Sequence, residues 1–325
     1  MNQNYWSRKK VLVTGADGFI GSHLTEKLLA LGARVSVLVR GTSINGTNQF
    51  HLRNTNHLKK KLDHIIAVNI GSTDCIPLVT RVKPQVIFHL AADAYVPYSF
   101  DRPLEVMTTN LHGTLNMLAA ALRLKRLERI VCTSSSEVYG SALKSSIDEN
   151  HPLNPTSPYA ASKVSADRFA YSYYQTYGLP LAIIRPFNTY GPRHTYDVIP
   201  KFIRMALCNE PITIHGTGEQ SRDFTYVDDM VRAFLLMGHS PKAVGEVVNF
   251  GTHKDISINR TARLIVELSQ SKSKIIHIPK RIAEVQKLRC DASKAYRLFG
   301  WRPKISIEEG LRRNIEWARE HQNQN

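Results

Sequence analysis

A short apolar strand that runs into closely spaced glycines is the feature that most constrains how this 325-residue chain can fold. The strand covers Val11–Thr14, the glycines are Gly15, Gly18 and Gly21, and a helical pattern of apolar residues starts at Phe19. Glycines permit a tight turn and let the backbone approach a pyrophosphate, which then sits at the helix N-terminus. The motif predicts a dinucleotide-binding turn; a plain strand, turn and helix with packing glycines is the alternative.

Strand and helix patterns alternate along the chain, as a doubly wound parallel sheet requires. The predicted strands are Val11–Thr14, Arg34–Val39, Ile65–Asn69, Val86–Leu90, Ile130–Ser134 and Leu181–Arg185, with helices near residues 19–31, 74–82, 104–124 and 159–177. We therefore expect an α/β fold, with a Rossmann-type doubly wound parallel sheet and a smaller C-terminal α/β lobe that binds a substrate. The Rossmann domain is expected at residues 8–188, with 224–250 returning to it, and the smaller lobe at 189–223 and 251–320.

Polar side chains follow the strand predicted at 130–134, at the edge where open α/β sheets place their ligands. They are Ser135, Ser136 and Glu137, and a strand-like spacing would point Ser135 and Glu137 to the same side. Tyr159 and Lys163 are four residues apart and share one face of a helix. An ammonium there lowers the tyrosine pKa, so that the phenol can exchange a proton with a sugar hydroxyl that Ser135 also binds. This is chemistry that interconverts a carbinol and a ketone, and its hydride must go to a cofactor.

Together these motifs resemble an extended short-chain dehydrogenase/reductase of the nucleotide-sugar-modifying group. The resemblance runs from about residue 8 to 320. It is carried by Gly15/Gly18/Gly21, His89–Ala92, Asn110 with Gly113 and Thr114, Ser135, Tyr159/Lys163, Arg185–Asn188, Tyr190–Arg193 and Arg222–Phe224. It implies a redox-neutral enzyme that oxidises a sugar carbon transiently with a bound nicotinamide. It also implies a homodimer formed through the helices around 104–124 and 159–177. Related epimerases, dehydratases and decarboxylases share most of these motifs.

Glu137 favours a 4,6-dehydratase within this group, because the segment before Val138 usually lacks a carboxylate in the 4-epimerases. Oxidation of C4 acidifies the C5 proton, and a carboxylate beside C5 can remove it before water leaves from C6 and the hydride returns there. The segment Arg185–Arg193 looks closest to dehydratases of N-acetylated nucleotide sugars. A carboxylate that only orders the strand end is the alternative for Glu137.

Ser136 keeps other reactions open. In the deoxythymidine-diphosphate-glucose dehydratases an aspartate commonly occupies this position and releases the water. The Ser136–Glu137 pair is instead similar to guanosine-diphosphate-mannose dehydratases and to uridine-diphosphate-glucuronate decarboxylases. A decarboxylase, a 4-epimerase and a non-catalytic sugar-nucleotide-binding protein therefore remain alternatives.

The cofactor is predicted to be NAD(P), with NADP favoured over NAD. Arg40 ends the second strand, where a carboxylate normally binds the ribose 2′-hydroxyl of NAD, and an arginine there suits a 2′-phosphate. Thr42 and Ser43 would donate further hydrogen bonds, while Arg40 stacked on the adenine of NAD is the alternative. The resemblance adds, as cofactor-binding residues, Gly15, Asp17, Gly18, Phe19, Ile20, Gly21, Asn69, Ile70, Leu90, Ala91, Ala92, Asn110, Ser134, Tyr159, Lys163, Pro186 and Asn188.

The expected substrate is a nucleotide-diphosphate sugar, whose diphosphate calls for cations with planar forks. The resemblance places Arg193, Arg222 and Arg289 at such positions. Its full set of substrate-binding residues is Asp93, Ser135, Ser136, Glu137, Asn188, Arg193, Val198, Ile199, Pro200, His215, Arg222 and Arg289. Neither the base nor the sugar is encoded in these side chains.

Composition excludes several other classes. The formal net charge is +16, but the basic residues are dispersed and no helix-turn-helix or aromatic-basic groove accompanies them, so no nucleic-acid partner is expected. A positive field would still draw in a nucleotide diphosphate. No apolar stretch reaches membrane-spanning length, and Met1–Lys10 lacks the apolar region of a signal peptide, which predicts a cytoplasmic protein with no membrane partner. The four cysteines contain no CxxC pair, and no metal site is predicted.

Overall fold

Short runs of apolar residues form the central sheet of the structure, a computed structural model that describes residues 3–40, 52–282 and 284–321. Across the sheet the strands are β11 (Val247–Phe250), β6 (Leu181–Pro186), β5 (Arg129–Thr133), β4 (Val86–His89), β1 (Lys10–Thr14), β2 (Arg34–Val39) and β3 (His64–Ala67). The pairs from β3 to β6 are parallel. The strand order reverses between β1 and β4, which confirms the expected Rossmann-type doubly wound sheet.

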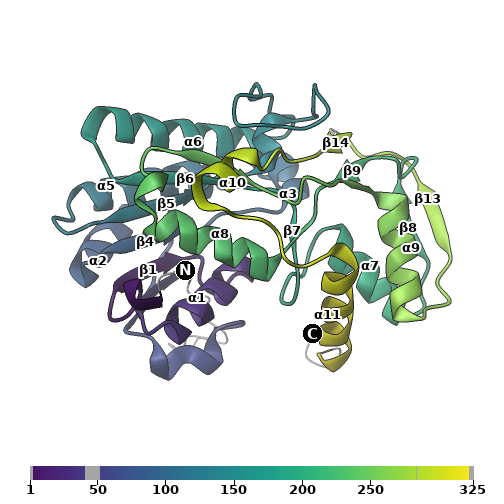
Figure 1. The fold of residues 1–325 in the computed structure, drawn as a ribbon, viewed down its shortest axis with the longest axis horizontal. Helices are drawn as coiled ribbons and strands as arrows, with labels where there is room; N and C mark the ends of the chain where they lie inside the picture. Colours follow the sequence, from purple (N-terminus) through teal and green to yellow (C-terminus); the bar gives the residue numbers. More distant parts are fainter. Residues whose placement is uncertain (1–2, 41–51, 283, 322–325) are drawn as a thin grey trace. The chain divides into compact units, whose positions relative to one another are not determined.

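Two units result when the chain is divided by its internal contacts (Figure 1). The first comprises Met1–Val138, Ser157–Arg185 and Val231–Val248, and it contains most of the sheet. The second comprises Tyr139–Thr156, Pro186–Met230 and Asn249–Asn325.

Helices cover the sheet of the first unit because its strands are apolar on both faces. They are α1 (Phe19–Ala30), α2 (Cys75–Val82), α3 (Val96–Asp101), α4 (Pro103–Met107), α5 (Gly113–Leu122), α6 (Pro158–Tyr177) and α8 (Val227–His239), the last of which continues from the second unit. Short 3₁₀ segments lie at η1 (Gln3–Tyr5), η2 (Asn56–Lys61), η4 (Ser136–Tyr139) and η5 (Pro241–Ala243), and a π-helical turn at η3 (Thr108–His112). A core cluster of buried side chains from β1, β4, β5, α2 and α5 fills the space between sheet and helices.

The longest helix, α6, has clear start and stop signals. Ser157 caps its N-terminus, since the serine hydroxyl accepts a hydrogen bond from Ala160 N at 3.1 Å, and Pro158 occupies the first turn. Gly178 ends the helix in the left-handed conformation, with φ of 63°. The helix that carries Tyr159 and Lys163 is therefore fixed at both ends by local sequence.

The second unit is built from short elements. Its strand groups are β7 (Thr189–Tyr190) with β10 (Thr225–Tyr226), β12 (Ile256–Ser257) with β9 (Ser221–Arg222) and β14 (Lys287–Leu288), and β13 (Ile275–Ile278) with β8 (Ile212–His215). Its helices are α7 (Val198–Leu207), α9 (Ile258–Ser269), α10 (Ser293–Phe299) and α11 (Ile307–Glu320). In Figure 1, α9 lies against α7, β8 and α11.

The structure corrects the sequence prediction for two elements, one strand and one helix, and it groups one segment differently. The strand predicted to reach Asn69 ends at Ala67, because Asn69 Oδ1 accepts a hydrogen bond from Gly71 N and closes a turn. The single helix predicted near 104–124 is interrupted by a π-helical turn, η3. Residues 139–156, expected in the Rossmann domain, group with the second unit, where Ala142 N donates to Lys287 O and Ile147 N to Arg289 O. The assignment of cofactor and substrate to the two lobes stays a prediction.

Candidate active site

Glycine is required in the turn between β1 and α1. Gly15 has a left-handed φ of +68°, and a Cβ there would lie 2.8 Å from Ala91 N. A Cβ at Gly21 would lie 2.1 Å from Gly15 O. Gly18 caps α1 without offering a side-chain acceptor to the N–H groups of Phe19 and Ile20. This glycine cradle at an uncapped helix N-terminus fits the pyrophosphate of a dinucleotide.

Asp17 lies in the same turn, but its carboxylate binds the protein's own backbone. Its Oδ2 accepts from Arg53 N at 2.7 Å, and its Oδ1 accepts from Asn54 N and Thr55 N at 2.9 Å each. Thr55 Oγ1 also donates to this carboxylate, at 2.8 Å. The Asp17 side chain, predicted to bind cofactor, thus anchors residues 53–55 beside the glycine turn.

Arg40 forms an ion pair that the sequence did not indicate. Its Nη2 lies 3.0 Å from Asp93 Oδ1, and the Arg40 side chain is 62% exposed. The sequence predicts that both residues bind ligands, Arg40 a 2′-phosphate and Asp93 the substrate. Thr42 and Ser43, the other two residues predicted at this end of the cofactor, lie outside the described residues.

The ends of β1 and β4 are joined through Thr14, which stands opposite His89 in the parallel register. Thr14 Oγ1 accepts hydrogen bonds from Leu90 N at 3.2 Å and from Ala91 N at 3.1 Å, and it contacts His89 Nδ1 at 2.8 Å. The segment of Leu90, Ala91 and Ala92, predicted to line the cofactor, is thereby fixed against the glycine turn.

His89 is buried and neutral, and its hydrogen-bond partners determine which ring nitrogen carries the proton. Thr114 Oγ1 donates to Asn110 O at 2.6 Å, so it accepts from His89 Nε2, at 3.0 Å. His89 Nδ1 is then the acceptor of the Thr14 hydroxyl. Burial, together with the positive charge of Lys163, lowers the pKa of His89 to about 3.

Asn110 lies in the π-helical turn η3, and both polar atoms of its side chain form hydrogen bonds to other protein groups. Its Oδ1 accepts from Asp93 N at 2.8 Å, while its Nδ2 donates to Asp93 O and to Ser162 Oγ. Ser162 Oγ in turn donates to Tyr159 O at 2.7 Å. The π turn therefore links the segment after β4 to the first turn of α6, while a cofactor contact of Asn110 stays a prediction.

Two other predicted cofactor residues, Asn69 and Ile70, have local roles. The Asn69 amide oxygen is held by Gly71 N at 2.9 Å. Ile70 is 5% exposed and belongs to the core cluster, and its carbonyl accepts from Asn116 Nδ2 at 2.9 Å. The Ile70 side chain therefore packs in the core, and its contact with a cofactor stays a prediction.

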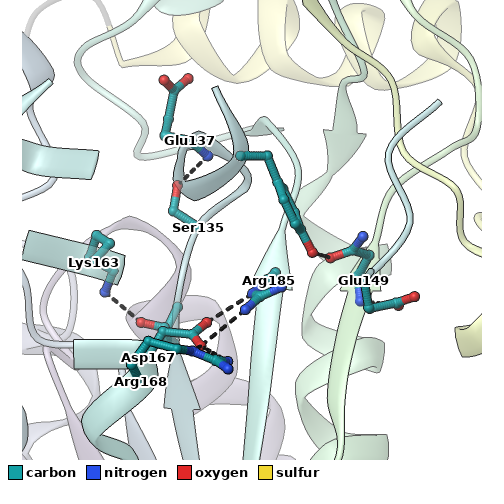
Figure 2. Close-up of polar contacts among 10 residues, drawn as sticks. Ser135, Glu137, Glu149, Lys163, Asp167, Arg168 and Arg185 are labelled. Carbon is teal, nitrogen blue, oxygen red and sulfur yellow. Dashed lines mark hydrogen bonds and ion pairs between the residues drawn. The ribbon is translucent and has the colours of Figure 1, made fainter. Parts of the chain in front are cut away.

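The segment after β5 is a turn, which corrects the strand-like spacing expected there. The strand ends at Thr133, Ser134 N still donates to Ile184 O of β6 at 2.8 Å, and Ser136 begins the 3₁₀ turn η4. Ser135 Oγ accepts from Glu137 N at 3.2 Å. Figure 2 shows the Glu137 carboxylate pointing away from the Ser135 hydroxyl. Ser135 and Ser136 are 9% and 3% exposed, so the turn holds both hydroxyls in a largely water-free place.

Tyr159 and Lys163 lie one turn apart on α6, as predicted, and both are buried. Lys163 Nζ donates to Thr133 O at the end of β5, at 2.5 Å (Figure 2). Burial lowers the pKa of Lys163 to about 8, so the ammonium remains the main form at neutral pH. An ammonium held one turn from a buried phenol is suited to stabilise a phenolate.

Sequence reasoning missed Asp167, although it continues the same spacing of four along α6. Its Oδ2 accepts from Arg185 Nε at 2.8 Å and its Oδ1 from Arg185 Nη2 at 3.0 Å. Burial opposes ionisation of this carboxyl, but Arg185 outweighs it and brings the pKa of Asp167 below its ordinary value. The signal was available in the repeat of polar residues on one helix face.

In the second unit, Asn188 follows Pro186, the last residue of β6. Its backbone carbonyl accepts from Thr225 N at 2.9 Å. The Asn188 Oδ1 atom is buried, and it finds no hydrogen-bond partner among the described residues. A buried acceptor of this kind suits a hydroxyl donor from a ligand.

Arg222 and Arg289 are brought together by the small sheet of β12, β9 and β14. Arg222 pairs with Leu288 in the register of β9 with β14, so Arg289 follows directly beside it. Arg222 lies 3.9 Å from Glu284, and Arg289 lies 3.9 Å from Asp255. Arg222 Nη1 also donates to Ser221 O at 2.9 Å, and Arg289 Nε donates to His253 O at 3.1 Å. A guanidinium has five N–H donors, so neither side chain is saturated by these contacts, and both can also bind an anion.

The remaining predicted substrate residues lie in two other segments of this unit. Arg193 has a left-handed φ of 70° in the loop before α7. Val198, Ile199 and Pro200 form the first turn of α7. His215 ends β8, and its Nδ1 lies 3.0 Å from Pro279 O.

The described residues contain neither a metal-binding cluster nor a membrane-spanning helix. No group of three or more histidine, cysteine, aspartate or glutamate side chains there is arranged to hold a metal ion. No helix in the same ranges is both long enough and apolar enough to cross a membrane.

The chain is similar to several known proteins. A sequence model for the family described as GDP-mannose 4,6 dehydratase matches residues 12–314. The dTDP-D-glucose 4,6-dehydratase of Bos taurus is 34% identical, over 96% of this chain and 89% of the relative. The UDP-N-acetyl-alpha-D-glucosaminuronate decarboxylase of Bacillus cytotoxicus is also 34% identical, over 97% of this chain and 99% of the relative.

Solved structures show the same similarity. A double mutant of DesIV, a dTDP-glucose 4,6-dehydratase of Streptomyces venezuelae solved with NAD bound, has 30% identity and a TM-score of 0.86. The match covers 96% of this chain and 98% of that one. Since a protein named UDP-glucose 4-epimerase is similar as well, similarity alone does not distinguish the three reactions.

Proposed function

The chain belongs to the GDP-mannose 4,6-dehydratase family, and we propose that it is a nucleotide-sugar 4,6-dehydratase. The reaction would convert a nucleotide-diphosphate sugar into its 4-keto-6-deoxy product with no net oxidation. The observation that carries the proposal is Glu137, whose backbone N–H donates to Ser135 Oγ in the turn after β5, within the unit that also holds Tyr159 and Lys163.

The oxidation at C4, which is the first half of the reaction, is assigned to Tyr159 and Lys163 of α6. Tyr159 takes the proton of the C4 hydroxyl, and Lys163 stabilises the phenolate that prepares it to do so. Ser135 hydrogen-bonds the same sugar oxygen. A bound nicotinamide supplies the hydride acceptor and donor that no side chain can provide. The result is a C4 ketone, which acidifies the neighbouring C5 proton.

The elimination is assigned to Glu137. Its carboxylate removes the C5 proton, and the C6 hydroxyl leaves. Ser136 stands next to Glu137 and is too weak an acid to protonate that hydroxyl, so Glu137 must return its own proton to form water. One carboxyl group would thus serve as base and then as acid. The hydride held by the nicotinamide would return to C6, and C5 would take a proton from solvent, which completes the 4-keto-6-deoxy product with no net oxidation.

The proposed cofactor is NAD(P), bound at the glycine turn, with NADP preferred through Arg40. The Asp93 ion pair does not oppose this, because exposed pairs contribute at most about 1 kcal/mol and a 2′-phosphate can replace the carboxylate. Binding constants for NADP and NAD, measured by calorimetry, test the preference. Arg40→Leu should abolish the difference between the two cofactors, and an equal or reversed preference in the wild type would refute it.

The substrate's diphosphate is assigned to Arg222 and Arg289, which share one small sheet. Asn188 is assigned to a sugar or phosphate donor because its buried amide oxygen has no partner among the described residues. Substituting either arginine by glutamine should raise KM for the nucleotide sugar far more than it lowers kcat, since uniform binding would be lost.

We further propose a homodimer formed through α3, α4, α5 and α6. These helices expose a set of large apolar side chains: Phe100, Leu104, Leu122, Phe169 and Tyr177. Leu104 alone is 81% exposed. A gathering of exposed apolar groups on adjoining helices is typical of a protein contact. A cytoplasmic location and the lack of a nucleic-acid partner stay predictions.

Decarboxylation of a nucleotide-sugar uronate is the second candidate, favoured by Ser136 in place of an acid. One experiment separates the reactions. The purified protein is incubated without added reductant against uridine-, guanosine-, thymidine- and cytidine-diphosphate sugars, and product masses are read. Loss of water establishes the dehydratase, loss of carbon dioxide the decarboxylase, and an isomer of unchanged mass an epimerase. Tyr159→Phe should bind the same sugar without turning it over.

A further inference from the structure

Asp167 is a buried carboxylate that the proposed reaction does not use. It is 2% exposed, and Arg185, its bidentate partner, is 2% exposed as well. Arg168, which is partly exposed, donates to the same carboxylate. Burying a charge is costly unless it is paired, so the carboxylate is fixed in place by its partners.

The position of this carboxylate relates it to Lys163. Tyr159, Lys163 and Asp167 recur every four residues along α6 and so share one face of the helix. Asp167 lies one turn beyond Lys163, on the side away from Tyr159. In the view of Figure 2, its carboxylate lies between Lys163 and the Arg185 guanidinium.

Charged and titratable groups approach Lys163 from three elements besides its own turn of α6. Tyr159 lies one turn away on α6, and Arg185 and Arg168 are positive but bind the Asp167 carboxylate. The groups on β5 and β4 carry no charge at neutral pH. On β5, burial raises the pKa of the Cys132 thiol to about 12, and Thr133 contributes a carbonyl. On β4, His89 is neutral. Among these neighbours, Asp167 is therefore the negative charge that opposes the cost of burying the Lys163 ammonium.

We propose that Asp167, held by Arg185, is a positioning residue that keeps Lys163 charged one helical turn from Tyr159. The guanidinium takes both carboxylate oxygens from its own side, so the carboxylate cannot rotate away from the helix face it shares with Lys163. Without this negative charge, Lys163 would lose its proton at lower pH and would cease to stabilise a phenolate. The role matters for turnover only through the proposed function, in which Tyr159 exchanges the proton of the sugar hydroxyl.

Direct titration of Lys163 tests the inference without any assay of activity. Protein labelled with ¹³C at the lysine Cε is titrated by NMR, and the Lys163 signal is assigned by its loss in Lys163→Arg. We expect Asp167→Asn to lower the pKa of Lys163 by about one unit, the effect of one neighbouring charge at short range. The matched control is Asp63→Asn, which breaks the ion pair with Arg34 outside this site and should leave the Lys163 titration unchanged.

Asp167→Asn removes the bidentate carboxylate that compensates the buried charge of Arg185, so a second variant covers the case in which Asp167→Asn does not fold. Asp167→Asn combined with Arg185→Gln removes both charges and keeps an amide pair. It should lower the pKa of Lys163 by less than Asp167→Asn does, because the more distant positive charge of Arg185 is lost together with the nearer carboxylate. A folded variant in which Lys163 titrates as in the wild type would overturn the inference.

Kinetics then separate this inference from the proposed function. If both hold, the alkaline limb of the pH–rate profile moves to lower pH in Asp167→Asn by the shift seen in the NMR titration. A shift in the titration, in a protein that turns over no nucleotide sugar, would refute the proposed function and leave the inference standing.

Discussion

The ammonium of Lys163 donates to the carbonyl of Thr133 at 2.5 Å, so the helix that carries the candidate acid–base pair is fastened to the end of β5. This bond satisfies one of three lysine protons, and burial lowers the pKa of Lys163 from 10.5 to about 8. The structure therefore keeps a charged group in a place that disfavours charge, which trades stability for a chemical role.

That cost gives the first prediction, that Lys163→Met is inactive but more stable than the wild type at pH 7. Burying the ammonium, which lowers its pKa to about 8, costs the folded wild type ~3 kcal/mol of stability. This cost is fully present below pH 8, where Lys163 is protonated in both the folded and the unfolded protein. Between pH 8 and 10.5 Lys163 is protonated in the unfolded chain but not in the folded one, so wild-type stability rises with pH. The difference in free energy of unfolding between Lys163→Met and the wild type therefore decreases. Urea midpoints at pH 7 and pH 10 measure it, and a gap that widens with pH would contradict the assignment.

A second prediction concerns the hydrogen bonds of His89. Thr114→Val removes the hydroxyl that accepts from His89 Nε2 and donates to Asn110 O. Two buried polar groups lose their partner, which should lower the free energy of unfolding by about 1–3 kcal/mol. Thr80→Val removes an exposed hydroxyl bonded to Pro77 O and serves as the control, with a change below about 0.5 kcal/mol. Equal chemical-denaturation midpoints for the two variants would contradict the assigned role of the Thr114 hydroxyl as the partner of His89 and Asn110.

The third prediction contrasts two left-handed glycines. Gly178→Ala places a Cβ in open space and should cost about 1 kcal/mol for its backbone conformation alone. Gly15→Ala carries the same conformational cost and also drives the Cβ against the backbone at Ala91. We expect it to be the less stable variant and to weaken NAD(P) binding at least tenfold. Calorimetric titration and thermal melting check both effects; a Gly15→Ala protein that binds NAD(P) normally would exclude the glycine turn as the cofactor site.

These cases show what the sequence could and could not predict. The glycine turn and the Tyr159/Lys163 pair were predictable, because each depends on spacing within one local element. The Thr14–His89 contact was not, because it depends on the register of two strands that are 75 residues apart. Local spacing reveals chemistry along one helix or turn, whereas contacts between strands need the assembled sheet.

The sequence also could not predict which side chains of a motif form contacts within the protein. Asp17 sits inside the predicted cofactor motif, yet its carboxylate is occupied by the backbone at residues 53–55. A strand-like spacing predicts that Ser135 and Glu137 point to the same side, but the chain turns at Ser136. A residue's place in a motif thus predicts which site it belongs to better than it predicts what the side chain touches.

A fourth prediction tests the homodimer. Leu104→Glu places a charge on the exposed apolar face of α3, α4, α5 and α6 and should convert a dimer into a monomer, because burying an unpaired carboxylate opposes association. Leu143 is 68% exposed and lies in the other unit, so Leu143→Glu should leave the mass unchanged. Light scattering after size-exclusion chromatography gives the mass; a wild-type monomer would refute the proposal.

The last prediction isolates Glu137, because the proposed function assigns its carboxylate to C5 and not to C4. Glu137→Gln retains the backbone N–H that Ser135 Oγ accepts and removes the base, so it should lower kcat by about 10²–10⁴ with little change in substrate binding. In deuterium oxide, wild-type product should carry deuterium at C5, whereas any residual substrate recovered from Glu137→Gln should carry none there. Because Tyr159 and Lys163 remain intact, bound cofactor should still become reduced when the sugar is added, visible as nicotinamide absorbance. Tyr159→Phe should show neither reduction nor exchange. If Glu137→Gln blocked cofactor reduction as completely as Tyr159→Phe, the carboxylate would belong to the first step, and its assignment to C5 would be wrong.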